Sequence, residues 1–205
     1  MARAFNGFNQ YLTTASSPAS GSPMTIALWG NRRGGRAFIS VGVANAQQRN
    51  QIQSDDGGGL QFVANGSLAE QVTSSVALPV GWNHLCGVFT SSTSREGFLN
   101  GASVATGTVN IGTQNTATRI TIGARDNTSI GNFINADIAE IGIWSAALTA
   151  AEIASLSKGM TCDKIRPQNL VFYAPIVRDL IDQKNGLAIT NNGGATVAAH
   201  PRIYP

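Results

Sequence analysis

Short apolar runs, each broken off by turn-forming residues, recur along the chain and constrain its fold more than any other feature. Five of them stand at residues 24–30, 36–43, 59–65, 71–78 and 82–89. Gly, Pro, Asn or Asp ends most of these runs, and such residues favour tight turns. Many short strands separated by turns are typical of an all-β sandwich or barrel. A length of 205 residues fits one such domain, which we expect to span 1–205 because no Pro- or Ser-rich linker divides it.

One hairpin turn is marked by a residue pair. Asn100-Gly101 lies between two β-type runs within residues 97–105. Asn-Gly readily adopts the positive φ angles of a type I′ turn. The sequence therefore predicts a β-hairpin there.

Residues 119–123 and 136–144 are predicted strands on either side of a polar loop. Strict alternation in the second strand places Ile138 on the same face as Glu140 and Trp144. Both faces of this strand carry apolar groups, so we expect it to be mostly covered.

One short helix is predicted over residues 149–158. Thr149 can cap its N-terminus, and Glu152 can complete a capping box. Ile153 and Leu156 form its apolar stripe. A helix of this length is marginal alone, so we expect it to dock on the sheets.

The chain has few charged residues, which limits the kinds of partner that it can bind. Only 12% of residues are charged, with a net charge of +3. The one basic cluster consists of Arg32, Arg33 and Arg36. Its functional interpretation is a contact with an anion or a partner, and the alternative is a solvated loop. We therefore expect no specific nucleic-acid binding. No apolar run is long enough for a membrane span, and we expect no signal peptide.

The acidic residues do not form a hydrolase pair. Glycosidases place two carboxylates about 5–9 Å apart across a cleft. Asp137 and Glu140 are three residues apart and would point to opposite faces of a strand. Asp55 and Asp56 are adjacent in a Gly-rich turn. We predict that the protein is not an enzyme.

Histidine and cysteine give a second candidate site. His84 and Cys86 share a strand face and would form a metal or nucleophile pair if they are functional, or packed strand residues if they are not. No Cys-x-x-Cys or His-x-x-x-His spacing supports zinc. Cys86 and Cys162 are expected to be reduced, because no export signal is present.

Several motifs occur together in a fixed order over roughly residues 3–159. They are RAFNGFNQYLTT, MTIALW, WNHLCGVF, REGFLNG, ITIGARD and ADIAEIGIWSAALTAAEIASL. Their order and spacing resemble the laminin-G-like, concanavalin-A-like jelly-roll family. The resemblance implies a jelly-roll sandwich of two antiparallel sheets, with the short helix plugging one edge.

The C-terminal segment resembles the part that usually opens such domains. Residues 169–205 contain LVFYAPIVRDLIDQKNGLAITNNGGATV. We therefore expect a circularly permuted order, in which this segment returns to pair near the N-terminal strand. The permuted order and both chain ends also resemble small laminin-G-like proteins of tailed bacteriophages.

Calcium is the cofactor that the resemblance implies, although none is required for the predicted role. The loop of residues 124–133 offers Asp126 and Asn127 as the calcium candidates, with Asn132 nearby. A second turn offers Asp55 and Asp56. Calcium takes six to eight oxygen ligands, some of them from the backbone.

Aromatic residues could support sugar binding. Tyr11, Phe62 and Phe133 lie near predicted loops and would serve as stacking platforms. The three tryptophans fall in strands, and we expect them to pack between the sheets.

Two functions follow from the resemblance. The first is a non-enzymatic virion protein that decorates a phage capsid, made in the host cytoplasm, with capsid protein and copies of itself as partners. The second is a carbohydrate-binding or host-adhesion module, whose partner would be a surface glycan.

Overall fold

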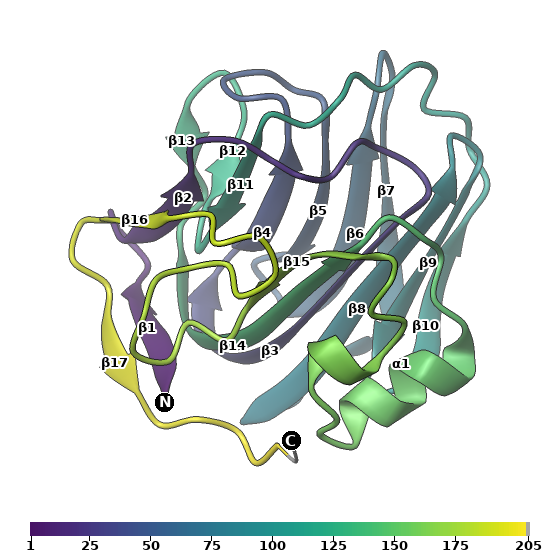
Figure 1. The fold of residues 1–205 in the computed structure, drawn as a ribbon. Helices are drawn as coiled ribbons and strands as arrows, with labels where there is room; N and C mark the ends of the chain where they lie inside the picture. The colour runs from purple at the N-terminus through teal and green to yellow at the C-terminus, as the bar shows by residue number, and fades with distance from the viewer. Residues whose placement is uncertain (204–205) are drawn as a thin grey trace.

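The computed structural model describes residues 1–203 and arranges most strands in two antiparallel sheets that pack face to face (Figure 1). This confirms the predicted jelly-roll sandwich of two antiparallel sheets with one short helix, which packs on the outer side of the eight-stranded sheet. Between residues 1 and 203, no helix has the length and apolar character needed to cross a membrane.

The eight-stranded sheet has the order β10-β9-β8-β3-β14-β1-β17, and β15 pairs with β14 outside this path. Its strands are β1 (Ala2–Asn6), β3 (Met24–Gly35), β8 (Trp82–Ser91), β9 (Ser94–Leu99), β10 (Ala102–Gly107), β14 (Ile134–Trp144), β15 (Leu170–Ala174) and β17 (Thr196–Ala198).

The seven-stranded sheet has the order β16-β2-β11-β4-β5-β6-β7. Its strands are β2 (Tyr11–Thr14), β4 (Ala37–Gly42), β5 (Arg49–Ser54), β6 (Gly59–Asn65), β7 (Ala69–Ala77), β11 (Arg119–Ile122) and β16 (Ile189–Asn192). A small ribbon of β12 (Arg125–Asp126) and β13 (Ile130–Gly131), the helix α1 (Ala150–Ser157) and a 3-10 turn η1 (Cys162–Lys164) complete the fold.

The main core lies between the two sheets and consists of their inward-facing side chains. Phe5, Phe38, Phe62 and Phe172 are fully buried there. Gly97 lets the Phe62 ring approach β9, because a Cβ at this position would lie 2.0 Å from the ring. The packing of these aromatic rings therefore fixes the spacing of the two sheets.

The predicted alternation in β14 is wrong at one point. A bulge at Glu140, where φ is +53°, interrupts the pairing with β3. One extra residue reverses the facing of the strand. Ile138 therefore points into the main core with Ile141, while Trp144 points to the opposite side of the sheet.

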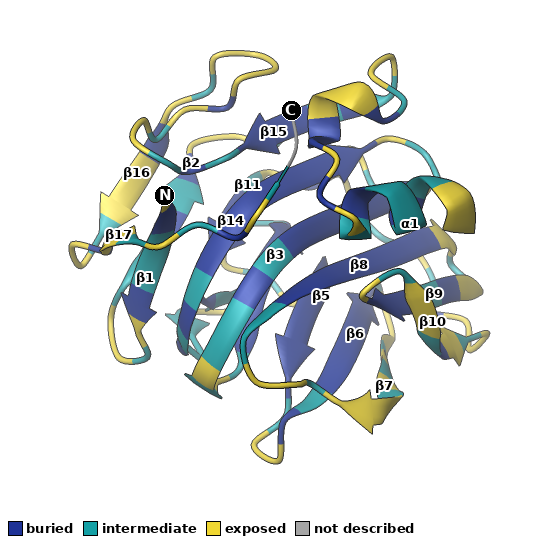
Figure 2. Ribbon diagram, turned by 90° about the horizontal axis from the view of Figure 1, so that it is seen from below, coloured by how far each residue is buried: buried dark blue, intermediate teal, exposed yellow. Residues whose placement is uncertain are grey.

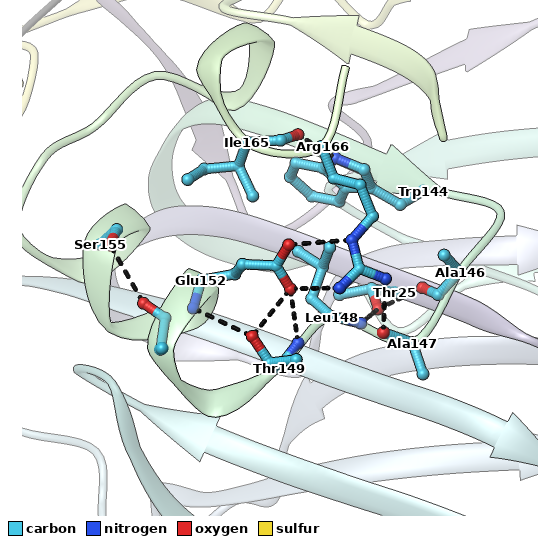
Figure 3. A network of polar contacts seen from close by, with 11 residues as sticks. Thr25, Trp144, Ala146, Ala147, Leu148, Thr149, Glu152, Ser155, Ile165 and Arg166 are labelled. Carbon is cyan, nitrogen blue, oxygen red and sulfur yellow. Dashed lines mark hydrogen bonds and ion pairs between the residues drawn. The ribbon is translucent and has the colours of Figure 1, made fainter. Parts of the chain in front are cut away.

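The outer side of the eight-stranded sheet carries a second apolar cluster beneath α1. Trp144 is buried there with Ile153 and Leu156 of the helix. The expected packing of the tryptophans between the sheets is therefore wrong for Trp144. Its indole N–H donates to the Ile165 carbonyl at 2.8 Å (Figure 3).

The helix begins with the predicted capping box. Thr149 accepts a hydrogen bond from the Glu152 backbone N–H, and Glu152 accepts one from the Thr149 backbone N–H at 2.7 Å. Arg166 reaches the same carboxylate at 2.6 Å (Figure 3). The local sequence therefore starts the helix, and the ion pair ties it to the chain that follows.

The hairpin prediction is also confirmed. Asn100 and Gly101, between β9 and β10, have φ angles of +51° and +84°. Both angles are those that a type I′ turn requires.

The two ends of the chain meet in the sheets. β17 pairs antiparallel with β1, and β16 pairs with β2. The N-terminus lies beside β17 (Figure 1). The last two residues of the segment 169–205 lie outside those that the structure describes. The permuted order itself stays a hypothesis.

We predict that Glu152→Gln lowers the free energy of unfolding by about 1 kcal/mol at pH 7. Partial burial raises the pKa of Glu152, but hydrogen bonds from Thr149 and Arg166 outweigh burial and hold the pKa below its usual value. A lowered folded-state pKa stabilises the fold above the unfolded pKa, and this stabilisation is lost as the pH falls through the folded value. Urea unfolding at pH 7, 5 and 3 should show the difference from the wild type shrink as the pH falls.

Asp163→Asn is the matched control, because this exposed carboxylate contacts only the neighbouring Lys164, at 3.5 Å. It should change the unfolding free energy by less than about 0.5 kcal/mol. A loss in Glu152→Gln that is as large at pH 3 as at pH 7 would contradict the capping role.

Candidate functional site

A hollow of about 380 Å³ lies on the outer face of the seven-stranded sheet. Side chains from β5, β6 and β7 form its floor, and residues just before β4 and around the β12–β13 ribbon form its wall. It is lined by Arg36, Arg49, Gln53, Val63, Asn65, Ala69, Glu70, Gln71, Arg125 and Asn132. Most of these groups donate or accept hydrogen bonds, so the hollow suits a polar ligand.

A chain of side-chain hydrogen bonds crosses the floor. The Arg49 Nε donates to Gln51 Oε1 at 2.6 Å, and Gln51 donates in turn to Gln53. Gln53 Nε2 donates to Gln61 Oε1 at 2.7 Å, and Gln61 Nε2 lies 3.5 Å from the Thr73 hydroxyl. Each glutamine amide therefore donates to the next residue of this chain in the same direction, which fixes the pattern of donors and acceptors.

All six residues of β5 are buried, including the polar ones (Figure 2). Gln51 is 0% exposed, and Arg49 is 6% exposed. The β12–β13 ribbon contacts β4, the strand beside β5. A buried polar floor of this kind costs free energy unless its groups are hydrogen-bonded.

Three buried polar atoms in this region have no partner among the described residues. They are Ser40 Oγ, Thr121 Oγ1 and Arg125 Nε. Ser40 pairs with Gln51 on one side and with Thr121 on the other, so the two hydroxyl groups extend the floor. Unpaired buried polar atoms are rare in folded proteins, and of these three residues only Arg125 lines the hollow.

The guanidinium groups of the hollow differ in their partners. Arg36 forms a two-pronged ion pair with Asp56. Arg49 and Arg125 have no carboxylate within 4 Å among residues 1–203. Burial, and next the charge of Arg125, lowers the pKa of Arg49 to about 10. Arg49 is still protonated at neutral pH, so two unpaired positive charges remain in the hollow.

The basic cluster predicted as a partner contact is divided by the fold. Arg33 binds Asp137 with contacts of 2.7 and 2.9 Å, and this hydrogen bonding raises the pKa of Arg33. Arg32 donates to the Asp55 carbonyl at 3.1 Å. Arg36 alone lines the hollow. Partner binding by Arg32, Arg33 and Arg36 stays a prediction.

The calcium candidates lie on the β12–β13 ribbon. Asp126 is buried, and one of its oxygens accepts from Arg119 Nε at 2.6 Å. Its other oxygen accepts from the Asn45 backbone N–H at 3.2 Å. Asn127 Oδ1 is buried without a partner. Calcium at Asp126 and Asn127 stays a prediction, and it requires Arg119 to release the carboxylate.

Histidine and cysteine lie away from the hollow. Burial lowers the pKa of His84 to about 3, so its imidazole is neutral, and it packs edge-on to Trp29 at 5.5 Å. Cys86 and Cys162 are free, buried thiols, and burial raises the pKa of both. Within residues 1–203 no group of three or more His, Cys, Asp or Glu side chains is placed to hold a metal ion.

The aromatic candidates for sugar binding separate into two kinds. Phe62 is 0% exposed in the main core, so its prediction as a loop platform is wrong. Tyr11 and Phe133 are partly exposed and face each other with ring centroids 5.9 Å apart. Neither lines the hollow.

The floor itself was missed by sequence analysis. β5 reads RNQIQS and contains one apolar residue, so no strand was predicted there. The available signal was the alternation of Arg49, Gln51 and Gln53 with Asn50 and Ile52. Such a pattern fits a strand whose outer face is polar and functional.

The sequence matches one known family over residues 5–154. The family is described as the Concanavalin A-like lectin/glucanases superfamily. A search of curated proteins finds no significant match.

Three solved structures share the fold at low sequence identity. A native heptameric SAP-like pentraxin from Limulus polyphemus has a TM-score of 0.70 at 16% identity, covering 95% of this chain and 93% of the pentraxin. A putative carbohydrate binding protein from Bacteroides ovatus has a TM-score of 0.68 at 13% identity, covering 95% of this chain and 58% of that protein. Domain 4 of an extracellular arabinanase from Geobacillus stearothermophilus, in complex with arabinotriose, has a TM-score of 0.55 at 17% identity, covering 76% of each chain.

Replacing Gln51 by leucine should lower the free energy of unfolding by about 2 kcal/mol, because Arg49 and Gln53 each lose a buried partner. Chemical denaturation measures this change. Thr73→Val is the matched control at the exposed end of the chain of hydrogen bonds, where the contact is 3.5 Å long. The control should cost less than about 0.5 kcal/mol. Equal effects in both variants would show that the floor is not a connected network.

Asp126→Asn separates the ion pair from calcium binding. The ion pair with Arg119 predicts a loss of about 2 kcal/mol that is the same in EDTA and in millimolar calcium. Thermal unfolding in the two buffers measures it. A calcium-induced rise in the wild-type Tm that the variant lacks would instead support the calcium site.

Proposed function

The chain belongs to the Concanavalin A-like lectin/glucanases superfamily, and from that premise we propose that it is a non-catalytic glycan-binding domain. The hollow over β5 and β6 carries the proposal. Its volume of about 380 Å³ falls at the small end of ligand pockets, which span roughly 300–1,000 Å³. One or two sugar units fit a site of this size.

The chemistry of the floor suits sugar hydroxyl groups. A hydroxyl group both donates and accepts a hydrogen bond, and the amides that line the hollow, those of Gln53, Asn65, Gln71 and Asn132, present both kinds of group. Because the floor is already ordered, little conformational entropy is lost on binding.

The acidic residues favour binding over hydrolysis. Glycoside hydrolysis uses two carboxyl groups about 5–9 Å apart. Among the residues that line the hollow, Glu70 alone carries a carboxyl group. This supports a binding module, as does the shared fold of the putative carbohydrate binding protein and of the arabinanase domain in complex with arabinotriose.

Capsid decoration of a tailed phage, with a location in the virion, stays a prediction from sequence resemblance. We place glycan binding first because the hollow is a formed site with unpaired polar atoms. Assembly into a symmetric homo-oligomer is compatible with both roles. Several hollows on one assembly would strengthen weak single-site binding.

The proposal is tested with a glycan array, followed by calorimetry on the glycans that bind. Ala69→Trp fills the hollow from an exposed position on β7, so it should abolish binding while the protein stays folded. Ala102→Trp, exposed on β10 of the other sheet and outside the hollow, is the matched control and should bind normally. Binding that survives in Ala69→Trp would place the glycan elsewhere, and no binding to any glycan would refute the proposal.

A further inference from the structure

We propose that the hollow takes an acidic glycan, and that Arg49 and Arg125 hold its carboxylate or sulfate group. This inference rests on the proposed glycan-binding function and names the chemical class of its ligand. A neutral sugar would need only uncharged hydrogen-bonding groups. The unpaired positive charges of Arg49 and Arg125 indicate an anionic ligand instead.

The charges of the hollow do not cancel. Arg36 is neutralised by Asp56, and Arg119 beside the hollow is neutralised by Asp126. Arg49 and Arg125 have no such partner, and Glu70 forms no ion pair among the described residues. Two unpaired guanidiniums therefore face one unpaired carboxylate, which leaves a net positive charge for an incoming anion.

The two arginines are also close enough to influence each other. The charge of Arg125 disfavours protonation of Arg49, and burial adds to this. Two like charges in a partly dry site repel, and an anion placed between them relieves the repulsion. Asp126 cannot do this fully, because its oxygens are engaged by Arg119 and the Asn45 backbone N–H.

Arg125 supplies the free donors. Its Nε is buried without a partner, and no other side-chain hydrogen bond holds its guanidinium among the described residues. Arg49, in contrast, is fixed by Gln51 at 2.6 Å and by the Gln47 carbonyl at 2.7 Å. The fixed guanidinium of Arg49 and the guanidinium of Arg125 can therefore bind one oxyanion from two sides.

The test uses pairs of probes, each made of an anionic glycan and a neutral counterpart. Calorimetry compares 3′-sialyllactose with lactose, trigalacturonate with its methyl ester, and 3′-sulfolactose with lactose. In at least one pair, we expect the anionic member to bind about tenfold or more tightly. Its affinity should also fall as sodium chloride is raised.

Arg125→Gln should remove most of this preference, so that the anionic and the neutral member of each pair bind with nearly equal affinity. Arg125 makes no side-chain contact that the fold depends on, so the variant is expected to fold, and circular dichroism checks this. Arg178→Gln is the matched control, because it removes the same charge from an exposed position outside the hollow. It should keep the full preference.

The outcomes separate this inference from the proposed function. A preference for the carboxylated or for the sulfated probe identifies the anion, and either one supports the inference. Equal binding of both members of every pair, blocked by Ala69→Trp, overturns the acidic ligand but keeps the glycan-binding site. A preference that Arg125→Gln retains also overturns it. The absence of binding by every probe, and by every glycan on the array, overturns both.

Discussion

The pairing of β14 with three other strands is the interaction on which the rest of the structure depends. β14 pairs with β3 along most of its length, with β1 near its start and with β15 near its end. β1 and β3 lie near the beginning of the chain and β15 near its end, so their pairing with β14 brings distant segments into one sheet. The bulge at Glu140 then directs Ile138 and Ile141 into the main core and Trp144 beneath the helix. One strand thereby connects both apolar clusters.

The seven-stranded sheet has a different balance of forces. Its inner face shares the apolar core, whereas its outer face carries glutamine, arginine, serine and threonine side chains that are shielded from water. The chain of amide hydrogen bonds from Arg49 to Thr73 offsets part of the cost of burying these groups. Ser40, Thr121 and Arg125 keep atoms without partners. Such an arrangement stabilises the fold less than an apolar face would, and it is the physical reason for placing a ligand there.

Local patterns were sufficient for much of the fold. Thr149 and Glu152 start the helix through contacts within one turn, and Asn100-Gly101 makes its turn through its own backbone preferences. The predictions that failed depended on contacts across the molecule. The alternation in β14 was broken by a bulge, and Phe62 proved to be a core residue, because the position of each is set by the opposite strand or sheet.

The sequence by itself determined the all-β class, the capped helix and the hairpin, because these depend on residues close together along the chain. Only the tertiary structure decided the site. Arg49 and Gln53 come from β5, Gln71 from β7 and Arg125 from the β12–β13 ribbon. They meet because the sheet brings β5, β6 and β7 side by side. Packing likewise decides which arginines have an acidic partner and which do not. The mildly basic composition does not reveal this difference, and the difference supports the proposed anionic ligand.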